Sequence, residues 1–353
     1  MAGTPSLAQS ELFPFHRGVL PVEGELLSSY LLRLAGAHSA DHYRFYSTLL
    51  PRAQLWNRDI DRGSDERVAK LLVERCRLAP AVVEAMSLRS YEVAIAGPGV
   101  RKGPGRGTWI NPIGVFHRTR TLAGLQVCPD CLAEQNIYQR IWRLSFVTSC
   151  PYHLSPLLVV CPGCAAPIIP HRQLAGTSIC HNCHIDHLSR TRRVTELAAV
   201  PPGQQVLIDA LAGRGVPTLE ERIPLPELVR GVALLRRWGM FRAPLSAKGV
   251  PIESQSPFVR SVYFDLVQEL AVQWPDSMGR LMVKGRISRQ TFETAKPPSW
   301  LACIGQHLSP RHSLKAPQKA QKSLASWLKH LRLTKPDGWR EKRASALVKA
   351  AAK

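Results

Sequence analysis

Eight side chains between positions 128 and 183 have the types and the spacing of metal ligands. They form three Cys-x-x-Cys pairs and one Cys-x-x-His pair, and the two intervening residues bend the backbone so that both members of a pair converge. Two such pairs close a tetrahedron around zinc, with bonds of about 2.3 Å to sulfur and about 2.0 Å to nitrogen. The eight candidate ligands are Cys128, Cys131, Cys150, His153, Cys161, Cys164, Cys180 and Cys183.

The order of the pairs predicts two structural zinc ions, one held by three cysteines and a histidine, the other by four cysteines. Eighteen residues separate Cys131 from Cys150, and fifteen separate Cys164 from Cys180, so each half of the segment supplies four ligands. An interleaved pairing, in which the first pair shares an ion with Cys161 and Cys164, stays open, because a sequence fixes ligands better than their grouping. Four protein ligands leave no position for water, which argues against hydrolytic zinc chemistry.

Other histidines and cysteines accompany these ligands. One of the four nearby histidines could replace a cysteine, but positions at the surface or behind the ligands are favoured, because four thiolates already complete the second site. Cys76 and Cys303 have no partners nearby in the sequence and are interpreted as buried small apolar residues. The alternative without metal is that the cysteines only pack in a core or form a redox pair. The occurrence of two successive sets of paired ligands disfavours this alternative. The four histidines are His171, His181, His184 and His187.

The N-terminal region predicts helices. One helix reaches from residue 27 to about residue 40, since apolar side chains recur on one face. A second begins at Ser64, where a hydroxyl cap and early carboxylates satisfy exposed amides. A third, from Pro80 to Leu88, follows a short turn, and the pair resembles a helix-turn-helix. Because Pro80–Leu88 offers no Arg, Asn or Gln to pair with base edges, packing or a protein contact is its favoured interpretation. The apolar face of the first helix is formed by Leu27, Tyr30, Leu31 and Leu34.

The remaining elements give a mainly α-helical fold class with small β zinc ribbons. Further helices are predicted near Gln204–Ala212, Glu227–Trp238, Phe258–Gln273 and Ser277–Lys284, and the third of them is apolar over a wide face, as a core helix is. We therefore expect an N-terminal helical, helix-turn-helix-like domain (1–110), a tandem zinc-ribbon domain (111–200), a C-terminal helical domain (201–303) and a basic tail (304–353).

The charge of the chain points to an anionic partner. There are 47 Lys and Arg against 26 Asp and Glu, a formal net charge of +21, and nucleic acid is the leading candidate. A membrane surface would require an anchor, and the longest uncharged apolar run, Leu154–Pro170, is interrupted by prolines. The N-terminus lacks the features of a secretory signal, so we expect a cytoplasmic protein, in whose reducing surroundings Cys-x-x-Cys pairs indicate metal and not disulfides.

Two basic segments are candidates for contact with nucleic-acid phosphates. The Gly97–Gly107 segment predicts a basic loop, and its glycine spacing is not that of a nucleotide-binding loop. The 304–353 tail carries 12 basic and two acidic residues, although its apolar stripe, Leu324 to Leu331, leaves docking on protein as the alternative. The candidate nucleic-acid-binding residues are Arg101, Lys102, Arg106, Lys315, Lys319, Lys322, Lys329, Arg332, Arg340, Lys342 and Arg343.

No catalytic constellation emerges from the sequence. A nucleophile elbow is missing, and carboxylates are too sparse to indicate a two-metal nuclease centre, although a dispersed acidic triad stays open. We therefore expect a protein that is not an enzyme.

Several short motifs occur in a fixed order over about residues 13 to 190. They are Leu20-Pro21, Glu25-Leu-Leu-Ser-Ser-Tyr-Leu-Leu-Arg33-Leu-Ala35, Cys128-Pro-Asp-Cys131-Leu-Ala-Glu134, Arg140-Ile-Trp-Arg-Leu144, Cys150-Pro-Tyr-His153 and Cys161-Pro-Gly-Cys164. Together they resemble the TniQ/TnsD family of bacterial transposon target-selection proteins. The order and spacing of the whole set carry the resemblance, since each motif alone is weak.

The resemblance implies a helix-turn-helix-bearing N-terminal unit, tandem zinc ribbons and a role in choosing the insertion site. Family members recruit a TnsC-like AAA+ ATPase, either beside an RNA-guided CRISPR effector such as Cascade, commonly as dimers, or by recognising a DNA site directly. We accordingly expect an adaptor that links a targeting complex to the ATPase and associates with the nucleoid during transposition. An autonomous, sequence-specific DNA-binding target selector of the TnsD type is the alternative, and a zinc hydrolase is a distant third.

Overall fold

The structure of the chain is a computed structural model. It describes residues 19–53, 55–57, 59–62, 65–99, 108–113, 124–172, 178–186, 199–217, 222–238, 250–272 and 289–295. The chain divides into two compact units, Met1–Val232 with Arg242–Trp274, and Ala233–Phe241 with Pro275–Lys353. All eight candidate metal ligands belong to the first unit. The four-part division expected from the sequence stays a prediction.

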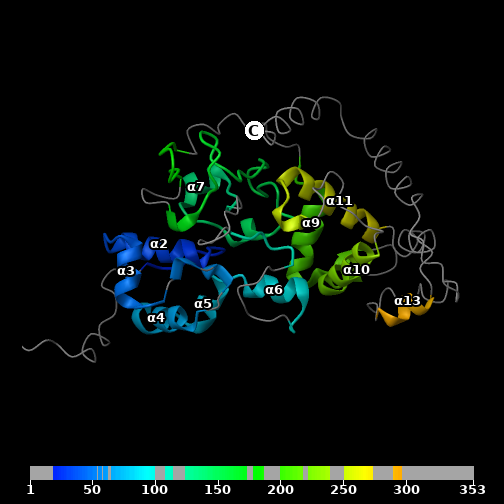
Figure 1. Ribbon diagram of the computed structural model, residues 1–353, viewed down its shortest axis with the longest axis horizontal. Helices are drawn as coiled ribbons and strands as arrows, with labels where there is room; N and C mark the ends of the chain where they lie inside the picture. Colours follow the sequence, from blue (N-terminus) through cyan, green and yellow to red (C-terminus); the bar gives the residue numbers. More distant parts are fainter. Residues whose placement is uncertain are drawn as a thin grey trace, which may run out of the picture. The chain divides into compact units, whose positions relative to one another are not determined.

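The fold is mainly helical, which confirms the predicted class (Figure 1). The α-helices are α2 (Leu27–Ala37), α3 (His42–Leu49), α4 (Glu66–Cys76), α5 (Pro80–Ala85), α6 (Arg89–Ala96), α7 (Pro129–Gln135), α9 (Pro202–Asp209), α10 (Leu225–Arg237), α11 (Pro257–Val272) and α13 (Arg289–Thr294). The short turns are η1 (Leu55–Asn57), η2 (Ile60–Arg62), η3 (Arg140–Arg143), η4 (Pro170–Arg172), η5 (Ala210–Arg214) and η6 (Ile252–Ser254). Strands β1 (Val216–Pro217) and β2 (Arg222–Ile223) pair antiparallel, with Val216 opposite Ile223.

The first N-terminal helix buries the face predicted for it. Leu27, Tyr30, Leu31 and Leu34 are all buried, and they belong to one core with residues of α4 and α5. Helix α4 begins one residue later than expected, because its cap is the carboxylate of Asp65, which accepts a hydrogen bond from the Arg67 amide at 3.0 Å. The expected hydroxyl cap at Ser64 is therefore wrong.

The helix predicted from Pro80 to Leu88 is shorter in the structure. Helix α5 ends at Ala85, and a separate helix, α6, follows from Arg89. The break serves a tertiary contact, since the Met86 carbonyl accepts a hydrogen bond from the Leu27 amide at the start of α2, at 2.9 Å. Three residues separate α4 from α5, but the helix-turn-helix interpretation of this pair stays a prediction.

Helices α9 and α11 pack closely in the C-terminal part of the first unit. A side chain on Gly203 of α9 would place its Cβ 2.3 Å from the Phe264 carbonyl oxygen of α11, so the two backbones approach where only glycine fits. Phe264 also meets Trp109 edge to face, with ring centroids 5.0 Å apart. Helix α11 confirms the core helix predicted at Phe258–Gln273, whereas the predicted helix Ser277–Lys284 lies outside the described residues.

Among the residues that the structure describes, none of the helices combines the length and the apolar character that crossing a bilayer requires.

Candidate metal centre

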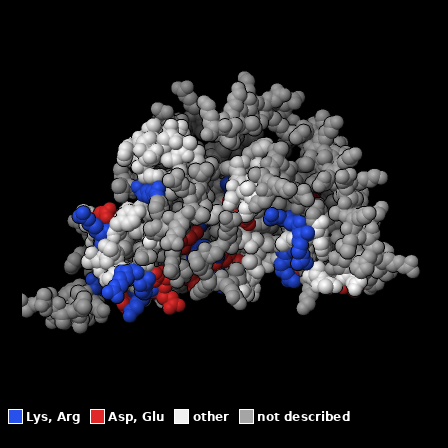
Figure 2. All heavy atoms as spheres, in the orientation of Figure 1, with Lys and Arg blue, Asp and Glu red and all other residues white. Residues whose placement is uncertain are grey.

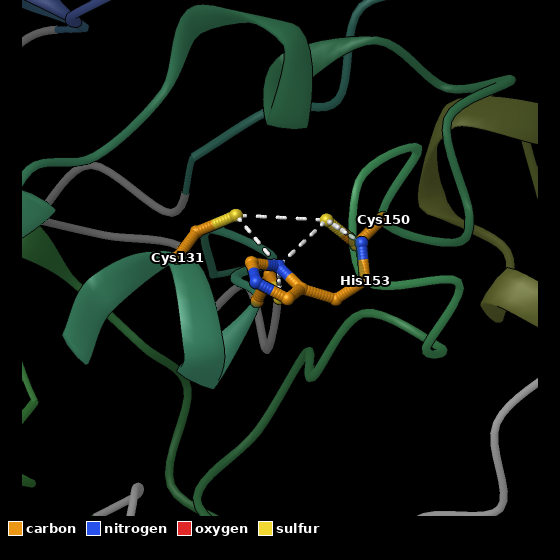
Figure 3. A group of neighbouring side chains, drawn as sticks. Cys131, Cys150 and His153 are labelled. Atoms are coloured by element: carbon orange, nitrogen blue, oxygen red, sulfur yellow. Dashed lines mark hydrogen bonds between the residues drawn. The ribbon is translucent and has the colours of Figure 1, made fainter. Parts of the chain in front are cut away.

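Three sulfurs and one ring nitrogen converge in the first cluster. Figure 3 shows Cys131, Cys150 and His153 pointing toward one another. The Sγ atoms of Cys131 and Cys150 are 3.5 Å apart, and Nδ1 of His153 lies 3.5, 3.3 and 3.6 Å from the Sγ atoms of Cys128, Cys131 and Cys150. A tetrahedral ion bonded at about 2.3 Å to sulfur and about 2.0 Å to nitrogen keeps its ligand atoms roughly 3.5 Å apart. The four atoms thus have the separations that a tetrahedral metal site requires.

Helix α7 and a tight turn position these ligands. Cys128 is the N-cap of α7, and proline at the next position suits the first turn of a helix, so that Cys131 returns to the same side one turn later. Cys150 and His153 lie in a turn where the His153 amide donates to the Cys150 sulfur at 3.4 Å. Cys128 and Cys150 are completely buried, so this cluster lies in the core.

The pKa values of the three thiols reflect their crowding. Hydrogen bonds from Cys131 and Cys150 lower the pKa of Cys128 to about 2. The hydrogen bond with Cys128 raises the pKa of Cys131, and it raises the pKa of Cys150 to about 11. Crowded thiols resist ionising together, and a bound cation favours the thiolate form of each.

The side chain of Glu134 is a contact of the first cluster that was not identified as functional from the sequence. Its Oε1 lies 2.9 Å from Nε2 of His153, the ring nitrogen that points away from the sulfurs. The signal in the sequence was its position three residues after Cys131, which puts both residues on one face of helix α7. Ser155 contacts the cluster from another side, with its hydroxyl 3.7 Å from the Cys128 sulfur.

The second cluster brings together four sulfurs. Cys161 and Cys183 have their Sγ atoms 3.5 Å apart, and those of Cys164 and Cys180 are 3.7 Å apart. The Asn182 side chain donates to the Cys164 sulfur at 3.4 Å and lowers the pKa of that thiol to about 6. Cys164 and Cys183 are only half-buried, so this cluster lies closer to the surface than the first. The sulfurs group with their own half of the segment, and not in the interleaved way left open by the sequence.

One turn geometry recurs in three of the four ligand pairs. The residue four positions after the first cysteine has a left-handed backbone, with φ of 48° at Leu154, 57° at Ala165 and 57° at His184. The amides of Ala165 and His184 donate to the carbonyls of Cys161 and Cys180 at 2.9 and 3.0 Å. Non-glycine residues rarely adopt this conformation, so the turns are held by their hydrogen bonds and, once bound, by metal.

Gln204 of α9 connects the first cluster to the C-terminal helices. Its side-chain oxygen accepts hydrogen bonds from the amides of Thr148 and Ser149 at 2.8 and 3.1 Å, and its side-chain nitrogen donates to the Ser149 carbonyl at 2.8 Å. These residues directly precede Cys150. A buried amide side chain thus fixes the backbone that delivers a ligand.

The Glu25–Arg33 motif attaches α2 to the segment between the first two ligand pairs. Glu25 accepts hydrogen bonds from Ser29 at 2.9 Å and from Nε of Arg33 at 2.8 Å. The Ser29 hydroxyl then accepts from the Tyr138 amide at 3.0 Å, and the Leu26 amide donates to the Tyr138 carbonyl at 2.8 Å. The motif therefore has a structural role at this contact.

A buried ion-pair network joins the same two regions. Arg143, with 1% of its side chain exposed, donates to the carboxylates of Asp59 and Asp61. Asp61 also accepts from the amide and the hydroxyl of Ser28 at 2.7 and 3.0 Å, at the beginning of α2. Burial raises the pKa of Asp61 to about 6, although Arg143 and Ser28 favour its charged form.

The remaining candidate residues have other positions. His171 is buried against the N-terminal helices, where its ring stacks on Trp56 at 5.5 Å and its carbonyl accepts from His42, so of the two favoured positions it does not occupy the one at the surface. His184 is exposed, and Cys76 is half-buried and not fully buried as expected. The following candidates lie outside the described residues: His187, Cys303, Arg101, Lys102, Arg106, Lys315, Lys319, Lys322, Lys329, Arg332, Arg340, Lys342 and Arg343.

The sequence was compared with known protein families. Residues 17–157 match the TniQ family, a range that contains the α2 motif, the ion-pair network and the whole first cluster, and that ends before the second cluster. No curated protein matches the chain. Residues 17–157 are therefore assigned as a TniQ domain, which implies a role in target selection for DNA transposition.

Proposed function

We propose that the protein is an adaptor in transposition, which links a targeting complex to a TnsC-like AAA+ ATPase. The observation that carries this proposal is the match of residues 17–157 to the TniQ family. The targeting complex is an RNA-guided CRISPR effector or the target DNA itself, and in this role the protein works in the bacterial cytoplasm beside the nucleoid. An adaptor needs rigid surfaces and no reacting group, so we further propose that the protein is not an enzyme.

The charge of helices α4 and α5 supports a protein contact for this pair. Residues 65–85 contain four basic and four acidic residues, a net charge of zero in a chain whose total is +21. Figure 2 shows basic and acidic side chains together near α4, and Arg67 and Lys70 pair with Asp65 and Glu74. A helix that binds in a DNA groove needs a positive electrostatic potential to attract the phosphates. The zero net charge of α4 and α5 therefore favours a protein contact.

The exposed face of α5 supports the same interpretation. Its exposed residues are Pro80, Ala81, Val82, Glu84 and Ala85, which include no Arg, Asn or Gln and one acidic group. Exposed apolar surface of this kind suits a protein partner better than the major groove.

The adaptor proposal is tested with the full chain and two substitutions on α5. We expect the chain to bind the ATPase or the effector of its own element, and Val82→Ser to weaken this binding without changing thermal stability. If α5 does not contact DNA, Glu84→Gln should leave binding to duplex DNA unchanged. Glu66→Gln is the matched control, because it removes one acidic charge from α4. Tight binding to one duplex sequence without partners, strengthened by Glu84→Gln, would contradict the adaptor and support the DNA-binding selector.

The alternative, an autonomous DNA-binding target selector, is supported by the concentration of charge in the last fifty residues. If this tail binds phosphates, each lost contact lowers the log–log salt slope by about 0.9. Deleting residues 304–353 should then flatten the slope by several units on unrelated duplexes and leave any site preference unchanged. Equal salt slopes for the full-length and the truncated protein would reject phosphate binding by the tail. Loss of ATPase recruitment by the truncated protein would indicate that the tail docks on protein instead.

We propose that each cluster holds one structural zinc ion. The donors are thiolates and one imidazole, the combination that zinc prefers in closed tetrahedral sites. The separations of the ligand atoms support this assignment, and zinc binding stabilises small modules that lack a large core. Elemental analysis of purified protein should give about two zinc ions, and Cys131→Ser or Cys161→Ser should each remove one. One ion or none in folded, reduced protein would contradict the assignment.

A further inference from the structure

The two nitrogens of His153 face different groups. Nδ1 lies within 3.6 Å of all three sulfurs of the first cluster, whereas Nε2 lies 2.9 Å from Oε1 of Glu134. A neutral imidazole has one donor and one acceptor nitrogen, and a carboxylate can only accept. The hydrogen of the neutral ring therefore belongs on Nε2, which leaves the lone pair of Nδ1 directed at the sulfurs.

We propose that Glu134 is a positioning residue for the metal of the first cluster. By accepting the Nε2 hydrogen it selects the tautomer that would bind through Nδ1, holds the ring with Nδ1 directed at the three sulfurs and increases the basicity of Nδ1. The inference rests on the metal binding proposed above. It concerns this cluster alone, because the second cluster contains no histidine.

The position of Glu134 supports a role beyond a surface ion pair. It lies on α7, three residues after Cys131, so one helix supplies two ligands and the group that orients a third. Its side chain is 60% exposed, so packing does not explain the contact with His153. An exposed ion pair by itself contributes little to stability, whereas a carboxylate behind a metal-binding histidine affects metal affinity by about 10- to 100-fold.

Three substitutions in the full chain test the proposal. Glu134→Ala removes the acceptor, and Glu134→Gln keeps an acceptor oxygen without the charge. Asp130→Asn is the matched control, because it removes an exposed carboxylate from the same helix, between Cys128 and Cys131. Zinc affinity is measured by competition with a chromophoric chelator. Each protein is then loaded with cadmium in place of zinc. Its cadmium-113 NMR spectrum distinguishes a three-sulfur site from a four-sulfur site.

We expect Glu134→Ala to lower the affinity of the three-sulfur site by about 10- to 100-fold and to shift or broaden its cadmium resonance. Glu134→Gln should recover part of this loss, while the four-sulfur site stays unchanged in every variant. Equal affinity in Glu134→Ala and wild type would overturn the proposal, as would an equal loss in Asp130→Asn, which would mean a general charge effect. A wild-type protein with fewer than two bound ions would instead contradict the proposed zinc function.

Discussion

A methyl group added at Gly203 should lower the stability of the protein through one identifiable backbone contact. An alanine Cβ there would lie 2.3 Å from the Phe264 oxygen, 2.4 Å from the Phe264 carbonyl carbon and 2.6 Å from the Asp265 nitrogen. All three atoms are backbone, so no side-chain rotation relieves the contact. Helix α9 must move away from α11, and the hydrogen bond from the Gly203 amide to the Asp265 carboxylate, at 3.0 Å, must lengthen.

Opposing contributions set the size of the effect. Alanine gains about 1 kcal/mol over glycine in helix propensity. Against this, overpacking costs about 1–3 kcal/mol, and weakening a hydrogen bond to a charged acceptor costs about 1.5 kcal/mol or more. We therefore expect Gly203→Ala to reduce the free energy of unfolding by about 2 kcal/mol. For a unit of this size, that corresponds to a fall of about 4–8 °C in Tm.

Thermal unfolding of zinc-loaded protein measures this change, and Gly36→Ala is the matched control. Gly36 also lies in a helix, but nothing occupies the space within 4 Å of an added Cβ, so the same substitution should raise stability by up to about 1 kcal/mol. Because Gln204 follows Gly203 and binds the backbone before Cys150, zinc should also leave the first cluster faster in Gly203→Ala. A Gly203→Ala protein as stable as Gly36→Ala would refute the close approach of α9 and α11.

Three further predictions concern other parts of the first unit. Arg143→Ala should cost about 3–5 kcal/mol in urea unfolding, because it leaves the buried Asp61 without its cation, and a cost below about 1 kcal/mol would contradict the network. Ala165→Gly should stabilise zinc-loaded protein by about 0.5–1 kcal/mol by relieving a left-handed residue, whereas Ala166→Gly next to it should destabilise. Burial lowers the pKa of His171 to about 4, so the unfolded state binds more protons and stability falls as the pH drops from about 6.5 to about 4. His171→Phe should lose less stability over this range than wild type, and parallel pH profiles would contradict the assignment.

The sequence predicted the parts of the site whose geometry is local. Two residues between paired ligands determine how a turn closes, so the four pairs were predicted directly, whereas their grouping was favoured by their order with the interleaved alternative still open. The apolar faces of α2 and α11 were likewise predicted, because helical periodicity reports burial directly. Glu134 was open to the same reasoning, since it lies one turn after Cys131, but its partner His153 is nineteen residues away.

The contacts that were not predicted join residues far apart in the chain. Arg143 meets Asp61 across 82 positions, and Gln204 binds Thr148 across 56. Arg260 of α11 donates to the Ser145 carbonyl across 115 positions and is fully buried. No local pattern marks a polar residue that will be buried with a distant partner, because its burial depends on tertiary packing. The break after α5 has the same origin, since the Met86 carbonyl is used by α2.

The two clusters contribute differently to the fold. The segment between Cys131 and Cys150 carries Tyr138 and Arg143, which hold the start of α2, and Ser145, whose carbonyl accepts from α11. Binding one metal ion through both ends of this segment closes it as a loop and removes much of the entropy that would oppose those contacts. Between Cys164 and Cys180, the Ile168 carbonyl accepts a hydrogen bond from the Leu125 amide at 2.7 Å, and the His171 carbonyl accepts from His42 of α3 at 2.7 Å, so this segment contacts other parts of the fold than the first does. Metal binding at the first cluster would therefore fix the backbone on which α2 and α11 pack, and residues 17–157, which match the TniQ family, contain that cluster.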